Sequence, residues 1–237
     1  MPARQSSEGT VGQIVGPQLG GALIWCGCSS GLGQASRDSL GFGCTFLDIN
    51  LDGRLDLLAV NGHIDETVRQ IHGNTGYAQP PHLFLNRGGG HFQDVAAQAG
   101  GGFATPKVSR GLAYGDFDRD GDLDLLISTN QGPAHLYRND VAPGVHGLRL
   151  RLIGTKSNRD AIGSVVRLTT ADGTQSRTVK TGSSYLSQSE LTLTFGLGPR
   201  DSATRIVVEW ASGAVQEFTT VAAGAYECTE GGRLSST

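Results

Sequence analysis

Short apolar runs separated by glycine and polar residues fill the chain between residues 40 and 140, and they predict β-strands. The runs fall into two sets, at 41–46, 55–60, 82–86 and 91–94, and then at 111–115, 123–129 and 134–139. The sets are related, because Ala134-His-Leu-Tyr-Arg-Asn139 is similar to Pro81-His-Leu-Phe-Leu-Asn86. A repeat of four short strands is typical of a propeller blade, so residues 38–143 are predicted to form a partial β-propeller of two blades.

The pattern changes after Pro143. Leu148, Leu150 and Leu152 alternate with arginines, which predicts a strand with one solvated face. Further strands are expected at 161–169, 174–181, 191–195, 205–210 and 214–219. Residues 146–231 are therefore predicted to form a small β-sandwich-like domain, with Trp210 in its core and 232–237 as a tail. Residues 1–37 have no sustained period and are predicted to be irregular, so the expected fold class is all-β.

An acidic segment connects the first two strands of each repeat. These segments are Asp48-Ile-Asn-Leu-Asp-Gly-Arg-Leu-Asp56 and Asp116-Phe-Asp-Arg-Asp-Gly-Asp-Leu-Asp124. Oxygen-bearing side chains recur at positions one, three, five and nine, and glycine stands at position six. Calcium takes about six to eight oxygen ligands, and a tight turn presents them from one short segment.

The spacing predicts two calcium sites with a structural role. The candidate side-chain ligands are Asp48, Asn50, Asp52 and Asp56 in the first loop and Asp116, Asp118, Asp120 and Asp124 in the second, with backbone carbonyls of Arg54 and Asp122 at position seven. An EF-hand is excluded because Ala59 and Ile127 occupy position twelve, where that motif has a bidentate glutamate. The alternative is a solvated acidic hairpin, but the repeated spacing favours calcium.

At these residues the chain resembles the FG-GAP, or VCBS, repeats of integrin α-subunit propellers. Gly41-Phe-Gly43 is similar to their phenylalanine-glycine element, whereas Gly111-Leu-Ala departs from it. The C-terminal segment resembles the ASPIC and UnbV domain at 154–163, at 182–189 and at 195–198. The combination looks like the cartilage acidic protein family and covers about residues 38–231.

The resemblance implies a calcium-stabilised propeller in an extracellular or cell-envelope protein that acts in adhesion or ligand binding and has no catalytic activity. Propellers have about four to eight blades and only two loop-bearing repeats are present, so the chain is expected to be N-terminally truncated. Open blade edges would expose unpaired backbone groups and favour association.

Charge and composition argue against several further kinds of partner and segment. A net charge of -3 and 17% charged residues argue against a nucleic-acid partner. No apolar run reaches the roughly 20 residues of a membrane helix, and the best signal-peptide candidate, 19–26, is too short to be recognised as one. Four cysteines, at 26, 28, 44 and 228, are interpreted as free thiols rather than a disulfide framework.

Three loops are candidates for contact with an unknown protein or carbohydrate ligand. Their residues are His63, Asp65 and Glu66; Lys156, Asn158 and Arg159; and Tyr185 and Gln188. The first loop, with His72 and His82 further along, also allows an alternative function, a metal-assisted hydrolase built on a propeller. The structural alternative is a polar loop in which the carboxylates cap backbone amides. For the C-terminal loops, the alternative is that Asn158 and Ser187 hold turns through hydrogen bonds to the backbone.

Overall fold

The computed structural model describes residues 30–71 and 73–237, and this part of the chain is all-β. Its helical elements are short: α1 (Leu32–Ala35), α2 (Val68–Ile71) and a single 3-10 turn, η1 (Ala96–Gln98). Among the described residues, no helix is both long enough and apolar enough to span a bilayer. The signal-peptide candidate, Cys26 and Cys28 lie outside the described residues, whereas Cys44 and Cys228 are free thiols.

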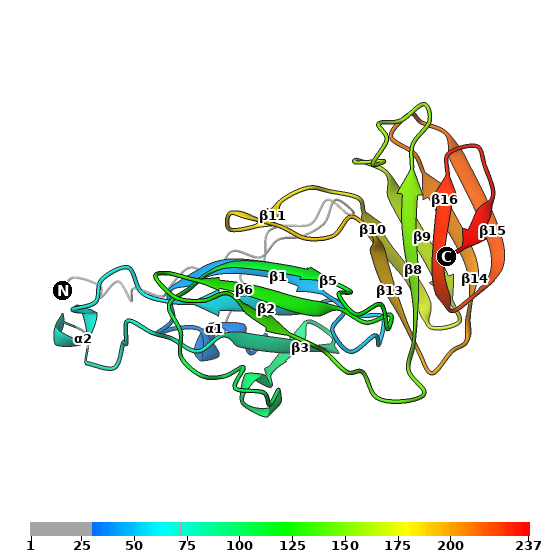
Figure 1. Cartoon of the computed structure of the whole chain (residues 1–237). Helices are drawn as coiled ribbons and strands as arrows, with labels where there is room; N and C mark the ends of the chain where they lie inside the picture. Colours follow the sequence, from blue (N-terminus) through cyan, green and yellow to red (C-terminus); the bar gives the residue numbers. More distant parts are fainter. Residues whose placement is uncertain (1–29, 72) are drawn as a thin grey trace, which may run out of the picture.

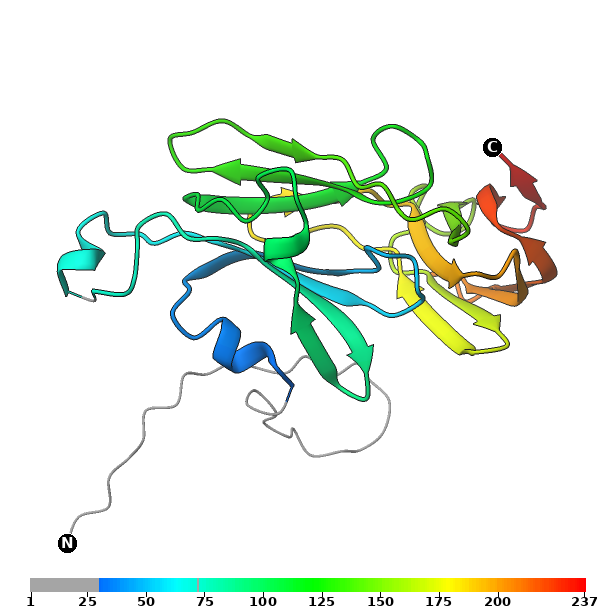
Figure 2. The same cartoon turned by 90° about the horizontal axis from the view of Figure 1, so that it is seen from below.

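The first predicted blade is an antiparallel sheet with strand order β1-β2-β3-β4. Its strands are β1 (Gly41–Leu47), β2 (Asp56–Asn61), β3 (His82–Gly88) and β4 (His91–Asp94). Each strand pairs with the next one along the chain, so the sheet is a meander. The predicted strands therefore fall where the apolar runs placed them. Residues 30–37, predicted to be irregular, include α1, which lies beside β4 (Figure 2).

The second blade contains three strands rather than four in the part of the chain that the structure describes. They are β5 (Ser109–Gly115), β6 (Asp124–Thr129) and β7 (His135–Tyr137), in the order β5-β6-β7. No apolar run lies between Asn139 and Pro143, after which the chain enters the next sheet. The two sheets fan apart like neighbouring blades, and they do not close into a ring (Figure 2).

A glycine allows the two blades to pack closely. A Cβ atom at Gly43, in β1, would lie 2.6 Å from the Leu112 Cβ of β5 and 2.8 Å from a methyl group of Val60. Any larger residue would push the sheets apart and expose the shared core. Fully buried side chains from both blades, including Leu58 and Ile127, fill this core.

The C-terminal region forms two four-stranded sheets that face each other. One sheet has the order β10-β9-β14-β15 and the other β13-β8-β16-β17. The first consists of β9 (Val165–Thr170), β10 (Gly173–Thr178), β14 (Ser202–Glu209) and β15 (Val215–Ala222). The second consists of β8 (His146–Ile153), β13 (Leu193–Gly198), β16 (Gly224–Thr229) and β17 (Leu234–Ser236). Figure 1 shows this sandwich standing upright beside the blades.

The alternation in β8 predicts the inner face of the sandwich correctly. Leu148, Leu150 and Leu152 are buried in one core together with Trp210, and each fully buried leucine contributes about 2 kcal/mol. The outer face differs from the expectation, because Arg149 is buried while Arg151 is exposed. Arg149 is covered by the blades, a contact that periodicity within one strand cannot reveal.

The sequence pattern missed the strands at the end of the chain. β16 runs parallel to β8, and β17, within the predicted tail, pairs with β16. It also missed a small hairpin made of β11 (Ser183–Ser184) and β12 (Ser187–Gln188). This hairpin extends from the sandwich over β1 and β5 of the blades (Figure 1).

Candidate metal centre

The second acidic loop brings three carboxylates together. Oxygen atoms of Asp116, Asp118 and Asp120 all lie within 4.8 Å of one another. The turn that positions them has positive φ angles at Arg119 (65°) and Gly121 (102°). The Asp116 carboxylate stabilises this turn, because it accepts the backbone amides of Asp120 and Gly121, both at 3.1 Å. The alternating side chains of positions one, three and five are thereby directed to one place.

Asp124, at position nine, has a second task that the sequence did not indicate. Its carboxylate accepts the amide of Phe117 at 2.7 Å and the amide of Asn139 at 2.9 Å. In the first loop, Asp56 likewise accepts the amides of Ile49 at 3.1 Å and Asn86 at 2.8 Å. Both aspartates are buried and link the loop to its own blade, Asp56 at the third strand and Asp124 two residues after the third strand ends. Their predicted role as cation ligands remains a prediction.

The first loop has the same backbone but different electrostatics. Leu51 and Gly53 have positive φ angles of 56° and 90°, at positions four and six as in the second loop. Asn50 is neutral, however, and the guanidinium of Arg54 pairs with Asp52. Only Asp48 and Asp56 remain as unpaired acids, and burial raises the pKa of each to about 6. The first loop therefore offers a cation less negative charge than the second.

The first loop is also one of the points where the C-terminal sandwich contacts the blades. Asp48 accepts the backbone amide of Gly196 at 3.1 Å, and Leu51 O accepts the amide of Gly198 at 2.8 Å. The Asn139 side chain, from the second blade, donates to Ile49 O at 2.8 Å. This loop is thus held by both blades and by the sandwich.

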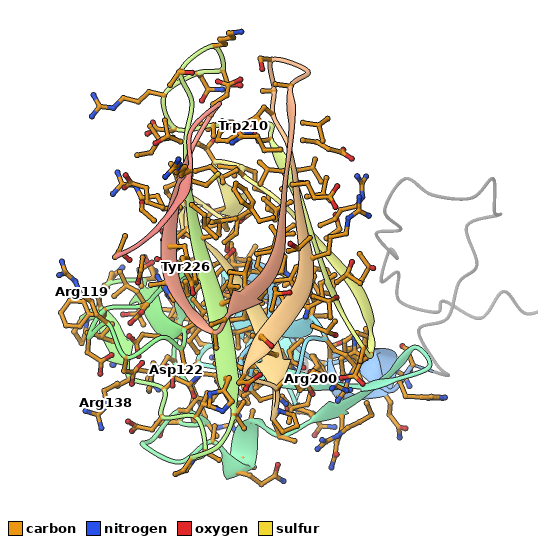
Figure 3. All side chains as sticks on the ribbon, turned by 90° about the vertical axis from the view of Figure 1, so that its right-hand side faces the viewer. Arg119, Asp122, Arg138, Arg200, Trp210 and Tyr226 are labelled. Atoms are coloured by element: carbon orange, nitrogen blue, oxygen red, sulfur yellow. The ribbon has the colours of Figure 1, made fainter. Side chains whose placement is uncertain are left out.

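A cleft of about 980 Å³ lies between the second loop and the sheet that contains β8 and β16. Arg149 lies in it and joins Asp116, at 3.2 Å, to Glu190, at 2.8 Å. Burial raises the pKa of Glu190, although the charge of Arg149 opposes this effect. Figure 3 shows Arg119 and Asp122 of the second loop on the same side of the molecule as Tyr226 of β16.

Asp122, at position seven, has a side chain that the calcium pattern leaves without a role. Its Oδ2 atom accepts the amide of Val141 at 2.8 Å, while its Oδ1 atom has no hydrogen-bond partner among the described residues. The residue is only 4% exposed, and burial raises its pKa to about 6. A buried acceptor without a partner is rare because it loses its interaction with water.

The insert after Asn61 does not assemble a catalytic group among its described residues. His63 Nδ1 accepts the amide of Asp65 at 3.0 Å, and Asp65 accepts the amide and hydroxyl of Thr67, both at 2.8 Å. Glu66 is exposed. His72 lies outside the described residues. These contacts are those of the structural alternative, a polar loop that caps its own backbone.

The structure also contains a Ser-His-Asp chain that sequence reasoning missed. His82 Nε2 lies 2.9 Å from Ser39 Oγ, and its Nδ1 lies 2.7 Å from the Asp94 carboxylate. Asp94 also accepts the amides of Leu83 and Ala96. None of the three residues lines the cleft described above. We interpret these hydrogen bonds as a structural link that holds Ser39, just before β1, against β3 and β4.

The loop of Lys156, Asn158 and Arg159 follows the C-terminal end of β8 (Figure 1), and none of these three residues lines the cleft. The Asn158 side chain bonds to both the amide and the carbonyl of Ile162, each at 2.8 Å, and so closes the turn. Glu230, absent from the sequence predictions, accepts the amides of Thr155, Lys156 and Ser157 at 2.7–2.8 Å. The Lys156 and Arg159 side chains remain candidates for partner contact.

The hairpin that carries Tyr185 and Gln188 binds within the molecule. Leu112 and Tyr114 of β5 donate their amides to the hydroxyls of Ser187, at 3.0 Å, and Ser189, at 3.2 Å. Tyr185 packs edge-on against Phe42, with ring centroids 5.1 Å apart. Gln188 accepts the amide of Gly182 and stabilises the hairpin. Residues predicted to contact a partner therefore help to fasten the sandwich to the blades.

Comparisons with known proteins agree with the sequence resemblance. An FG-GAP-like repeat family matches residues 48–127, and the ASPIC and UnbV family matches residues 154–232. Cartilage acidic protein 1 of Xenopus tropicalis is 32% identical over 168 residues, which are 67% of this chain and 26% of that protein. The human protein is 46% identical over 59 residues, covering 24% of this chain and 9% of the relative. The mouse protein is 42% identical over 66 residues, covering 27% and 10%. The chain thus spans about a quarter of its Xenopus relative at most.

Proposed function

We propose, for a chain that joins an FG-GAP-like repeat to an ASPIC and UnbV domain, a calcium-stabilised and non-catalytic interaction module that works outside the cell. The observation that carries this proposal is the cluster of Asp116, Asp118 and Asp120. The names of the relatives, which associate them with cartilage, support the extracellular location.

Electrostatic repulsion is the reason to expect a cation in the second loop. Three carboxylates whose oxygens lie within 4.8 Å of one another repel strongly unless a positive charge lies among them. Arg149 pairs with Asp116 but is shared with Glu190. The exposed Arg138 approaches Asp118 only to 3.9 Å, so the cluster keeps a net negative charge. Oxygen ligands in a flexible turn suit calcium better than magnesium, which demands near-octahedral geometry.

The two loops are proposed to bind calcium with different affinities. The second loop contains five aspartates, of which Arg149 pairs with one, whereas the first contains three, of which Arg54 pairs with one, and an asparagine at position three. The second loop should therefore fill first. In both loops the ion would hold the turn in place and would take no part in a reaction.

The proposal is tested by measuring bound calcium and thermal unfolding of the full chain. At calcium concentrations 100 times the Kd, stabilisation of about 2.7 kcal/mol is expected relative to chelator. The double variant Asp118→Asn, Asp120→Asn should lose most of this effect. Asp160→Asn, the same chemical change on an exposed residue, should keep it. An unchanged unfolding midpoint together with no bound calcium would refute the calcium part of the proposal.

The non-catalytic part is tested separately. The variants His63→Ala and Glu66→Ala should fold normally and retain calcium. Among the described residues, the His63 side chain bonds only to the backbone two residues away, and Glu66 is exposed. If a defined hydrolytic turnover is found in the full chain and disappears in these variants while calcium remains bound, the alternative function as a metal-assisted hydrolase is correct.

A further inference from the structure

The cleft between the second loop and the sandwich contains acceptors that lack donors. Asp122 is 4% exposed, lines the cleft, and has an Oδ1 atom without a partner among the described residues. Asp122 is not a member of the cluster formed by Asp116, Asp118 and Asp120 of the same loop. Glu190 also lines the cleft, and its Oε1 atom is likewise buried without a hydrogen-bond partner among the described residues. Asp122 and Glu190 therefore both line the cleft, and each has one buried carboxylate oxygen without a hydrogen-bond partner among the described residues; the Arg149 Nη1 donor beside them also lacks one.

The charge of the cleft is negative. Six acidic side chains and three arginines line it, and Arg149 is already paired with Asp116 and Glu190. A divalent cation held by the second loop would offset two negative charges and would still leave an acidic lining. One of the six acidic side chains, Glu227, comes from β16 of the sandwich. A cationic ligand is favoured here and an anionic ligand is repelled.

An aromatic side chain completes the recognition elements. Tyr226 of β16 is half-buried and lines the cleft, and Figure 3 shows it on the same side as Asp122. An ammonium group is attracted both by carboxylates and by the face of an aromatic ring. An ammonium group also supplies three hydrogen-bond donors, whereas the Asp122 Oδ1 acceptor has no donor among the described residues.

We propose that this cleft binds a primary ammonium group, presented by lysine side chains of a basic peptide segment in a partner. The ammonium group donates to Asp122, and Glu190, Tyr226 and Glu227 line the same cleft. The inference rests on the proposed interaction function and gives that interaction a partner chemistry. Free polyamines carry the same group, and the experiment distinguishes the two sources.

Isothermal titration of the full chain at constant calcium tests the proposal. The probes are a capped tri-lysine peptide, the same peptide with each Nζ acetylated, a tri-glutamate peptide and spermidine. Binding of the tri-lysine peptide is expected, with no binding of the acetylated and acidic peptides. Spermidine binding as tight as that of the peptide would assign the ammonium group to a free polyamine. Equal binding of the acetylated peptide would overturn the proposal.

Two variants locate the site. Asp122→Asn should weaken binding of the tri-lysine peptide at least about tenfold, since it removes a buried charge partner. Asp160→Asn removes one negative charge at the far end of the sandwich and should leave the affinity unchanged, which controls for net charge. If Asp122→Asn does not fold, Glu227→Gln provides the same test from β16. Unchanged affinity in the folded variant would overturn the proposal.

Calcium binding is measured on the same samples. Normal calcium binding without any affinity for the tri-lysine peptide would refute only the ammonium site. Absence of both would refute the proposed function as well.

Discussion

Gly196 donates its backbone amide to the carboxylate of Asp48 at 3.1 Å, although the two residues are 148 positions apart in the chain. The bond is buried and joins β13 of the sandwich to the first acidic loop. A Cβ atom at residue 196 would lie 2.2 Å from the backbone carbon of Leu51 and 2.4 Å from Asp48 Oδ2. Only glycine allows this approach.

Gly196→Ala should therefore separate the sandwich from the first loop. The clash involves backbone, so the free energy of unfolding should fall by about 1–3 kcal/mol, the usual range for overpacking. Denaturant unfolding of the full chain measures the change. Gly73→Ala is the matched control, because nothing lies within 4 Å of its added Cβ. Equal stability of the two variants would show that the contact does not hold the sandwich in place.

The aspartates of the second loop should separate into two classes. Asp124→Asn places an amide group against two backbone N–H donors, so unfolding in chelator should become about 1–3 kcal/mol easier. Asp118→Asn alters a partly exposed side chain and should change stability in chelator by less than about 0.5 kcal/mol. It should nevertheless reduce the stabilisation by calcium. A large loss in chelator for Asp118→Asn would mean that both residues hold the turn directly.

Glu230 gives a dependence on acid pH. Burial alone would raise its pKa, but the hydroxyl of Ser212 and the amides of Ser157, Thr155 and Lys156 lower the pKa to about 2. The folded state therefore holds this proton more weakly than the unfolded chain, whose ordinary value is 4.5. The stabilisation is complete above about pH 4.5 and is lost as the pH falls towards 2.

Glu230→Gln should lower the unfolding midpoint at pH 7, because Gln cannot accept all of these donors. The difference from the unmodified chain should shrink between pH 4.5 and 2, as thermal unfolding across that range will show. Glu66→Gln, on the exposed insert, should not change the midpoint. A difference for Glu230→Gln that stays constant down to pH 2 would contradict the assignment.

The hairpin of β11 and β12 should lose its hold when its aromatic contact is removed. Tyr185→Ala removes the edge-on contact with Phe42, and a loss of about 0.5–1.5 kcal/mol is expected beyond the buried area. The neighbouring Leu186 is 88% exposed, so Leu186→Ala should leave stability unchanged. Limited proteolysis within the hairpin reports the difference. Equal cleavage rates for the two variants would show that Tyr185 does not anchor the hairpin.

Local periodicity was sufficient to predict most strands and both acidic loops. The runs around Asp48 and Asp116 are short, apolar and repeated, so the position of each strand follows from residues close to it in sequence. β4 begins at His91, where the start of a strand was predicted, and Trp210 lies in the core as expected. The same reasoning could not predict the burial of Arg149, whose partner Asp116 belongs to the second loop of the blades.

The intramolecular contacts of the polar loops could not be predicted in the same way, because the residues they bond to are distant in sequence. Tyr185 and Gln188 looked like exposed binding residues, yet their hairpin contacts β5 about 75 positions earlier. Glu230 likewise accepts amides more than 70 positions away. The serine-rich hairpin offers one retrospective signal, since hydroxyl groups at 184, 187 and 189 each accept an amide from a blade strand.

The hairpin and the first loop meet neighbouring parts of β1. Ser184 accepts the amide of Cys44 in the middle of that strand, and Gly196 donates to Asp48 just beyond its end. A single contact would allow the sandwich to rotate relative to the first blade. Two contacts at different points along β1 resist both rotation and bending. A force applied to the sandwich would therefore be transmitted to the first blade through β1, and the two parts are expected to move together as a stiff unit.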